Sequence, residues 1–334
     1  MAVALRFAPA HQVDDVAHVV VDGGPIASTV LTLSHWPGSP TPLELLDDLS
    51  AQIAFHALRR PGLLDGIEVV TNNHFDQDGL ASVFALVDPD TAVQHEAQLV
   101  DLARAGDFGT FDDRVSIRLA FVLAAWDDDE RSPLDPELLA GPYPDRCGHL
   151  YAELVPRVPE LLADVDALRP WWEHEDAHLE ESLRAIDAGV VSITERPDLD
   201  LAVVTVPDGW AERTTTRFTV GRHDAVHPAA IASRTDRMRL AIVQAGRPRL
   251  ECRYETWVMF RSRPVMLRPD LRLVAERLQD VDPDAGWVAD PPRALTPRLR
   301  SSAESALAPD TWLAHVTASL AVAPPAWDPI DPSW

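Results

Sequence analysis

The chain has 334 residues, 46% of them apolar, and carries a formal net charge of −24. A chain of this length and apolar content can bury a sizeable core, and the length predicts two or three domains. All 29 basic residues are Arg, which excludes mechanisms that need a Lys, such as P-loop NTP hydrolysis, protein-kinase chemistry and Schiff-base catalysis. The acidic balance also argues against duplex DNA or an anionic membrane as a partner.

The N-terminal residues lack a basic segment followed by a sustained apolar core, as a secretion signal would have. No window reaches the roughly 18 apolar residues of a membrane span. Two Cys residues in so long a chain provide no disulfide framework. We therefore expect a cytoplasmic protein.

The first part of the chain alternates between strand and helix patterns. Apolar runs ended by Gly and Pro predict strands at 17–23 and 28–36, and a third at 67–71. Pro42 opens a predicted helix that ends near 59, and another helix begins at 79. This alternation predicts an α/β domain with a mainly parallel sheet, in which ligands collect at the carboxyl ends of the strands. His35 follows the apolar run TVLTL of the second strand and is a candidate for that edge.

The remaining chain predicts a helical connector and a second domain. Helices are expected at 91–105 and 113–126, followed by Pro-interrupted helical pieces, and from Val190 short β-rich runs dominate, with helices near 270–279 and 309–321. We predict four parts: an α/β domain at 1–130, a helical connector at 131–188, an α+β domain at 189–325 and an extended tail at 326–334.

The motif H-x-D-x-D-G lies in the turn between the third strand and the helix that follows it. His74, Asp76 and Asp78 occupy alternate positions of an extended segment, so their side chains project to the same side and can bind a divalent cation. Gly79 lets the backbone turn into the helix. The structural alternative is that Asp76 or Asp78 caps the helix by accepting hydrogen bonds from its first amides.

The segment VVTNNHFDQDGLAS resembles the first motif of the DHH phosphoesterases, through His74, Asp76, Asp78, Gly79 and Ser82. The resemblance implies a DHH-like fold in which strand-end carboxylates hold Mn²⁺ or Mg²⁺ ions that activate water against a phosphoester. The segment LVDLARAGDFGTF is similar to a later family motif and implies that Asp107 is a further metal ligand. Over its whole length the chain also resembles an uncharacterised bacterial family of unknown function.

Three departures from the DHH pattern leave an alternative open. The Asp-His-His triplet, which supplies ligands to the family's dinuclear centre, does not occur, and only 28 residues separate Asp78 from Asp107. Asn72 stands where several members carry a further His ligand. The alternative is a non-catalytic binding module that keeps the strand-turn-helix shape with an incomplete metal centre.

A basic stretch begins the predicted second domain: residues 213–268 carry 12 Arg against 4 acidic residues, whereas residues 1–212 carry 12 Arg against 39. Forked guanidinium groups suit phosphate recognition. Arg222 and Arg253, with His223 and His227, are our candidates for substrate binding. Pairing of these Arg residues with the acidic first domain is the alternative.

The segment His174-Glu175-Asp176-Ala177-His178 is a formal H-E-x-x-H, the pattern of zinc metallopeptidases. Its acidic surroundings favour a solvated helix with Trp171 or Trp172 packed inward, so a zinc peptidase is the second alternative. The preferred prediction is a Mn²⁺- or Mg²⁺-dependent phosphoester hydrolase that acts on a nucleotide or short oligonucleotide. Asp76, Asp78 and Asp107 are its predicted catalytic residues. The same three residues and His74 are its predicted metal ligands.

Overall fold

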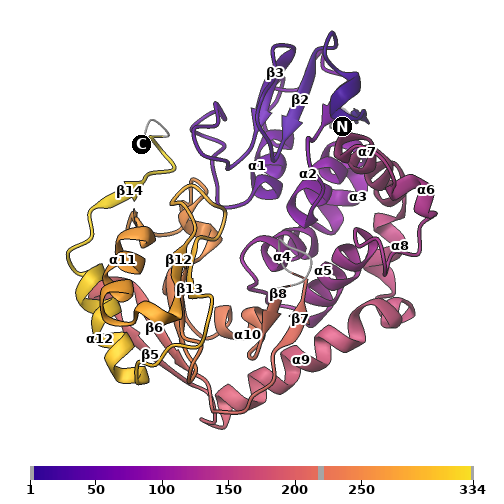
Figure 1. Cartoon of the computed structure of the whole chain (residues 1–334). Helices are drawn as coiled ribbons and strands as arrows, with labels where there is room; N and C mark the ends of the chain where they lie inside the picture. Colours follow the sequence, from indigo (N-terminus) through magenta and orange to yellow (C-terminus); the bar gives the residue numbers. More distant parts are fainter. Residues whose placement is uncertain (1–3, 217–221, 332–334) are drawn as a thin grey trace. The chain divides into compact units, whose positions relative to one another are not determined.

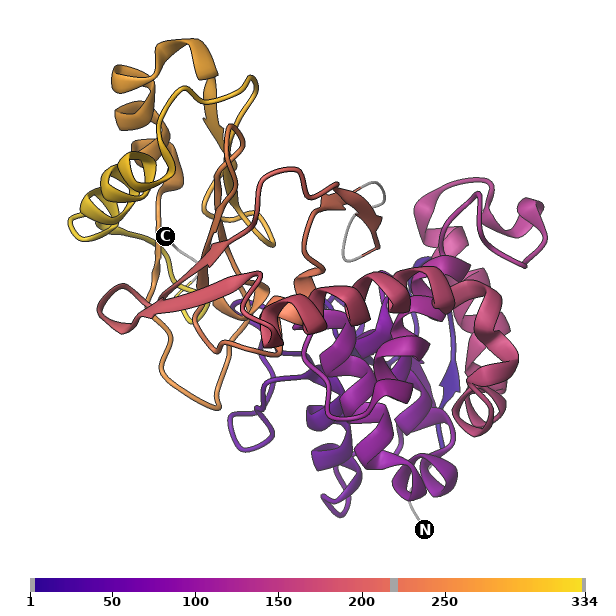
Figure 2. The ribbon, with the colours of Figure 1, turned by 90° about the horizontal axis from the view of Figure 1, so that it is seen from below.

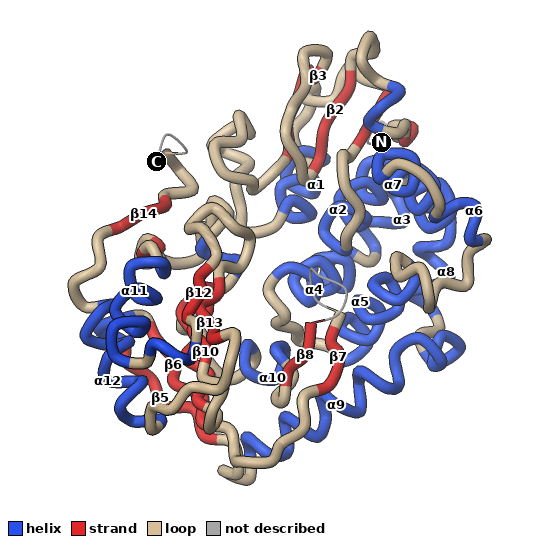
Figure 3. Tube along the Cα trace, in the orientation of Figure 1, coloured by secondary structure: helices blue, strands red, loops and turns tan. Residues whose placement is uncertain are grey.

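The computed structural model describes residues 4–216 and 222–331, which form two compact units (Figures 1 and 3). Of the described residues, unit 1 comprises 4–177 together with 215, 216 and 222. Unit 2 comprises His178–Thr214 and residues 223–331. The segment predicted as a helical connector thus lies in unit 1 as far as Ala177. The position of one unit relative to the other is not determined, so each is described by itself.

Unit 1 contains a four-stranded sheet in the order β1-β4-β2-β3, and all of its strand pairs are parallel. All four residues of β2 are buried, because β2 is a central strand of the sheet, and the continuous valine run matches this position. The strands have the following bounds: β1 Arg6–Phe7, β2 His18–Val21, β3 Thr29–Leu33 and β4 Val69–Thr71.

Helices α1 and α2 contact the strands of this sheet, α4 packs on α2, and α5 packs on α4 (Figure 1). Apolar residues fill the interfaces, and nine of the eleven residues of α2 are buried. The helices of unit 1 have the following bounds: α1 Ser50–Leu58, α2 Gln77–Val87, α3 Pro89–Gln94, α4 Glu96–Asp107, α5 Arg114–Trp126, α6 Pro136–Leu139, α7 Tyr143–Leu154 and α8 Val158–Ala163. The helix α9, Arg169–Asp187, crosses the boundary between the units.

The predicted helix at 42–59 is wrong at its start, because α1 begins only at Ser50. Residues 43–45 form a turn and residues 48–49 a bend instead. The α1 amides of Ser50 and Ala51 donate to the distant carboxylate of Asp78, so a tertiary contact fixes where the helix begins. Pro42 is a local start signal that this contact overrides.

Unit 2 is built on a six-stranded mixed sheet in the order β12-β13-β10-β9-β6-β5, in which β6 and β9 are parallel and the other pairs antiparallel. Successive residues of β6 enter two different cores: Leu201 and Val203 pack with α11 and α12, whereas Ala202 and Val204 pack on the opposite face. The strands have the following bounds: β5 Ser192–Arg196, β6 Leu201–Thr205, β9 Arg239–Val243, β10 Arg249–Cys252, β12 Trp287–Ala289 and β13 Arg298–Ser301.

The helices α11 and α12 lie side by side on this sheet (Figure 2). Two small sheets, β7-β8 and β11-β14, complete the strands. The tail predicted as extended supplies β14, which pairs antiparallel with β11. The bounds are α10 Pro228–Ala232, α11 Leu271–Val281, α12 Pro309–Leu320, β7 Arg213–Thr215, β8 Arg222–Asp224, β11 Arg268–Pro269 and β14 Pro325–Trp327.

The predicted fold class is confirmed: the N-terminal part is α/β with a parallel sheet, and a second domain follows. Among the described residues, no helix combines the length and the apolar content that crossing a membrane requires. The N-terminal strands end at one edge of their sheet, and the side chains that follow those ends form the candidate site.

Candidate metal centre

Three neighbouring parallel strands deliver acidic and imidazole side chains to the same edge of the sheet. Asp22 directly follows β2, His35 lies two residues beyond β3, and the H-x-D-x-D-G motif follows β4. Because β2 is hydrogen-bonded to both β4 and β3, Asp22 lies between the residues that those two strands deliver. We call Asp22, His35, His74, Asp76, Asp78 and Asp107 the strand-end cluster.

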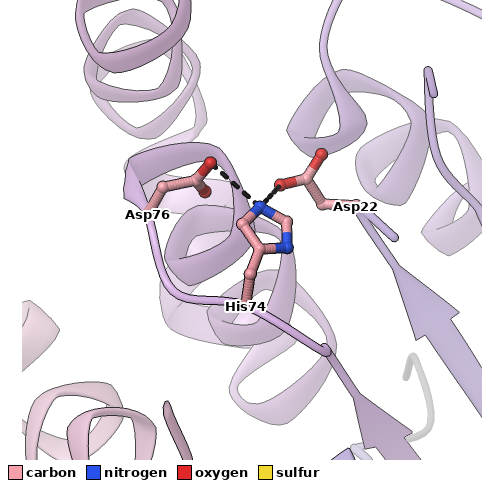
Figure 4. A group of neighbouring side chains, drawn as sticks. All are labelled: Asp22, His74 and Asp76. Atoms are coloured by element: carbon pink, nitrogen blue, oxygen red, sulfur yellow. Dashed lines mark hydrogen bonds and ion pairs between the residues drawn. The ribbon is translucent and has the colours of Figure 1, made fainter. Parts of the chain in front are cut away.

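Asp22, His74 and Asp76 form the outer group of this cluster (Figure 4). The His74 Nε2 lies 3.3 Å from Asp22 Oδ2 and 3.1 Å from Asp76 Oδ2. Figure 4 shows the imidazole nitrogen between the two carboxylates. The ligand atoms of the three side chains lie within 4.8 Å of one another, close enough to share one cation.

Asp22, His35 and Asp78 form the inner group, and its ligand atoms also lie within 4.8 Å of one another. The His35 Nε2 lies 3.4 Å from Asp22 Oδ1 and 3.8 Å from Asp78 Oδ2. It lies 3.5 Å from Asp107 Oδ2 as well, so Asp107 adjoins the inner group. Asp22 belongs to both groups, and each of its carboxylate oxygens faces one of the two imidazoles.

Both imidazoles are oriented by a contact at the nitrogen remote from the carboxylates. His35 Nδ1 donates to the backbone carbonyl of Asp48, and His74 Nδ1 lies 3.2 Å from the side-chain oxygen of Asn73. These contacts turn each Nε2 toward the carboxylates. A remote nitrogen held by a carbonyl or carboxylate is how proteins orient a metal-ligating His. This donor set therefore fits a cation.

Two of the motif carboxylates also cap helices: Asp76 caps the helix that follows the motif, as the structural alternative expected, and Asp78 caps a different helix. Asp76 Oδ1 accepts a hydrogen bond from the Gly79 amide at 2.7 Å and so caps α2. Asp78 accepts from the amides of Ser50 and Ala51 at 2.8 and 2.7 Å, at the start of α1. A carboxylate oxygen has two lone-pair directions, so capping and cation binding are compatible.

Gly79 is required by close packing at the start of α2. A Cβ atom at this position would lie 2.4 Å from both Asn72 Nδ2 and Tyr151 Oη, which are buried. No real Cβ tolerates such contacts, so any other residue would displace the loop that carries His74 and Asp76. The Gly of the motif thus allows a close approach. Gly106 serves in the same way, because a Cβ there would meet the Gln77 side chain at 2.5 Å, and it precedes Asp107.

Asp22 has a left-handed backbone conformation, with φ of 46°. This region is unfavourable for residues other than Gly, although Asp tolerates it better than most. Its side chain is almost fully buried and accepts a hydrogen bond from Ser50 Oγ at 2.7 Å. Strained backbone that the surrounding structure holds in place is typical of functional residues. The strain aims the Asp22 carboxylate into the cluster.

The ionisable groups of the cluster perturb one another. Burial raises the pKa of Asp22, but hydrogen bonds and charge from His35 and His74 outweigh it, so the net pKa is lowered. Burial, followed by the charge of Asp22, raises the pKa of Asp78 to about 8. Burial lowers the pKa of both imidazoles, but their carboxylate neighbours reverse this effect, and the His74 pKa lies well above its usual value. Protons and cations therefore compete for the same ligand atoms.

The charge balance favours divalent cations at this edge. Four carboxylates face two imidazoles, and the side chains of Asp22, Asp78 and Asp107 are at most 2% exposed. Buried carboxylates that face one another are costly unless positive charge compensates them. Carboxylate oxygens suit Mg²⁺ and Mn²⁺, and the single imidazole of each group also suits heavier divalent ions such as Zn²⁺ or Fe²⁺.

The structure brings His74, Asp76, Asp78 and Asp107 together, as the predicted ligand set requires. The predicted substrate-binding residues have structural contacts. In unit 2, Arg253 pairs with Glu255 and donates to the Thr235 carbonyl, while the side chain of His227 caps α10. His223 is exposed and lies 3.4 Å from Thr214 Oγ1, and Arg222 is buried in β8. Their role in substrate binding stays a prediction.

Most described Arg residues of the basic stretch pair with acidic residues or carbonyls within unit 2. These contacts account for much of the positive charge that suggested phosphate recognition. The ion pairs are Arg213–Glu181, Arg234–Asp187, Arg237–Glu195, Arg249–Asp224, Arg253–Glu255 and Arg263–Asp200.

The H-E-x-x-H segment lies on α9, but the interpretation as a solvated helix is wrong for its central residues. Glu175 and Asp176 are buried, and they bind Thr216 and Arg114, respectively. His178 is buried as well, whereas His174 is exposed. Among the described residues, neither His belongs to a group that could hold a metal ion. The expected inward packing of Trp172 is confirmed.

Sequence reasoning missed Asp22 and treated His35 only as a strand-end candidate. A signal for Asp22 existed: it directly follows the apolar run VVV and precedes two Gly residues. An acidic residue between a buried parallel strand and a flexible turn is a candidate ligand by the same rule that found the motif after β4. The motif drew attention because its ligands are close in sequence.

Comparison with known families adds one assignment. Residues 3–329 match the family of unknown function DUF6687. The chain belongs to this family. No curated protein and no solved structure matches the chain at a significant level. The resemblance to DHH phosphoesterases therefore rests on the motifs alone, and a function has to be argued from the strand-end cluster.

Proposed function

We propose that this protein is a metal-dependent phosphoester hydrolase with a DHH-like, two-cation centre that acts on a nucleotide or a short oligonucleotide. One observation carries the proposal: the buried carboxylate of Asp22 faces His35 Nε2 with one oxygen and His74 Nε2 with the other. A carboxylate in this position can bridge two cations, with Asp78 completing one ligand group and Asp76 the other. Mn²⁺ and Mg²⁺ are the proposed ions.

The cluster supplies what the motif comparison lacked. The missing Asp-His-His triplet would contribute a carboxylate and imidazoles, and Asp22 and His35 offer both kinds of ligand from neighbouring strand ends. Both residues precede the H-x-D-x-D-G motif in the chain. The presence of both kinds of ligand supports a complete metal centre over an incomplete one. It therefore favours an enzyme over a non-catalytic binding module.

The proposed reaction is hydrolysis. A water oxygen forms a bond to phosphorus, the bond from phosphorus to the ester oxygen breaks, and one proton of the water ends on the released alcohol. Divalent cations, when bound, lower the pKa of a coordinated water and screen the charge of the reacting phosphoryl group. The residues of the chain hold the ligand atoms in place: Asp48 and Asn73 orient the imidazoles, and α1 fixes Asp78.

The test is an assay of purified protein with Mn²⁺ on a panel of dinucleotides, short oligonucleotides and nucleotide monoesters. We expect turnover that Asp22→Asn abolishes, because this substitution removes a carboxylate common to both groups. Asp129→Asn is the matched control, since its side chain is 73% exposed and lies outside the cluster. Calorimetric titration with Mn²⁺ should show close to two equivalents bound to the wild type. Cation binding without turnover would favour the binding module, and absence of cation binding would refute the centre itself.

A further inference from the structure

We infer that the two ligand groups hold their cations unequally: the inner group retains a slowly exchanging ion that is part of the fold, and the outer group holds an exchangeable ion that meets the substrate. The inference rests on the proposed two-cation centre and assigns different roles to its halves. It follows from burial, from the supporting contacts and from the elements that supply each group.

The two groups differ in exposure. In the inner group the side chains of His35 and Asp78 are fully buried, at 0% exposure. In the outer group the side chains of His74 and Asp76 are 20% and 24% exposed. Asp22, which both groups share, is 1% exposed. Solvent and substrate can therefore reach the outer half of the centre, while the inner half lies behind it.

The groups also differ in how firmly their ligands are held. The N-terminal end of α1 and Asp48, two residues before it, fix the inner ligands: Ser50 and Ala51 donate to Asp78, Ser50 Oγ donates to Asp22, and the Asp48 carbonyl accepts from His35. All of these partners are buried. Of the outer ligands, His74 is held by the side chain of Asn73 in an exposed contact, and Asp76 accepts, among the described residues, a single backbone hydrogen bond, from the Gly79 amide. Supporting contacts of this kind raise affinity for a metal ion.

The inner ligands come from separate elements, whereas the outer ones are mostly local. Asp22 follows β2, His35 follows β3, and Asp78 lies in the first turn of α2. Asp107 adjoins them from the end of α4. His74 and Asp76 belong to one short loop. Release of an inner ion requires buried elements to separate, while release of an outer ion requires only side chains of that loop to move. The inner ion should therefore also stabilise unit 1.

The test follows release of Mn²⁺ from loaded, desalted protein after addition of excess chelator. We expect two phases of equal amplitude in the wild type, with rates that differ by about 10-fold or more, the scale on which supporting contacts alter metal affinity. His74→Gln should lose the fast phase and keep the slow one. His56→Gln is the matched control: its side chain is 38% exposed, it pairs with Asp47, and it should keep both phases.

A second measurement uses the wild type alone and so does not depend on a variant that folds. Thermal unfolding is recorded with both ions bound, after loss of the fast phase and after loss of the slow phase. We expect most of the fall in Tm at the last step. Two ions that leave at one rate, or a His74→Gln protein that loses the slow phase, would overturn the unequal roles while leaving the proposed hydrolase intact. A protein that binds no Mn²⁺ would overturn both.

Discussion

The two units bury charged side chains in opposite ways. In unit 2, the fully buried guanidinium of Arg268 donates to the side chain of Thr256 and to backbone carbonyls at 292, 294, 295 and 253. Burial lowers its pKa to about 10, which still leaves it charged at neutral pH. In unit 1, the buried carboxylates of Asp22, Asp78 and Asp107 gather around His35 and around one another.

This difference separates a structural charge from a functional one. A buried charged group whose hydrogen bonds all go to neutral acceptors holds the surrounding loops together. It has no hydrogen-bonding group left to bind a ligand. Buried like charges that converge on one point destabilise the fold unless protons or cations compensate them. The cluster of unit 1 is therefore the candidate functional site.

The largest expected effect is on stability in unit 2. Arg268→Met should destabilise this unit by about 3–5 kcal/mol, because it leaves several buried carbonyls without donors. Hydrogen exchange measured by mass spectrometry should show faster exchange in β9–β11, with unchanged Mn²⁺ binding. Arg272→Met is the control, since this Arg is 55% exposed and pairs only with Asp270 among its described ion pairs. Loss of Mn²⁺ binding in Arg268→Met would contradict the distinction between a structural buried charge in unit 2 and a functional one in unit 1.

The next effect is a pH dependence of unit 1 that a cation should remove. The pKa of Asp78 is raised in the fold to about 8, and those of His35 and His74 are raised too. Each of these groups contributes stability below its unfolded pKa and loses it as the pH rises through its folded pKa. With chelator present, unit 1 should therefore become less stable between about pH 6.5 and 8.5.

Urea unfolding at both pH values, with chelator or with Mg²⁺, checks this expectation. Bound Mg²⁺ should reduce the loss of stability with rising pH, because it replaces the protons at the ligand atoms. Asp78→Asn should also reduce this loss, whereas Asp90→Asn, an exposed change in α3, should not. A stability that rises with pH in chelator would contradict the assignment of charges in the cluster.

Gly79→Ala should destabilise unit 1 by about 1–3 kcal/mol, the usual cost of forcing an extra methyl group into packed surroundings. Helix propensity alone predicts the opposite sign, because Ala is favoured over Gly inside a helix. The new methyl group would collide with Asn72 and Tyr151 and displace the loop of the outer group. Mn²⁺ affinity should fall with stability. Gly24→Ala is the control, since nothing lies within 4 Å of its added Cβ.

The smallest effect is a pH dependence of opposite sign in unit 2. Burial, followed by the charge of His227, lowers the pKa of His178 to about 4. The unfolded chain then binds a proton that the folded chain does not, so stability falls as the pH drops from about 6.5 toward 4. His178→Gln should lose less stability between pH 7 and 5 than the wild type, measured by urea unfolding. The exposed His174→Gln should behave as the wild type does.

Several elements could be predicted because their signals are local. The valine run of β2 and the strand before the motif predicted buried parallel strands, and both were found. The start of α1 could not be predicted, because it depends on Asp78, a residue 28 positions away from Ser50. The burial of Glu175 and His178 was also missed, since a charged segment shows no sign of the partners that cover it.

The sequence by itself determined half of the candidate site. His74, Asp76, Asp78 and Gly79 stand close together in the chain, and the geometry of an extended segment followed by a helix suffices to bring them to one side. Asp22 and His35 carry no such spacing signal. They join the site only because β2 is paired between β4 and β3, which places Asp22 between two imidazoles. The order of strands in a sheet is set by long-range pairing and packing, so only the tertiary structure could complete the centre.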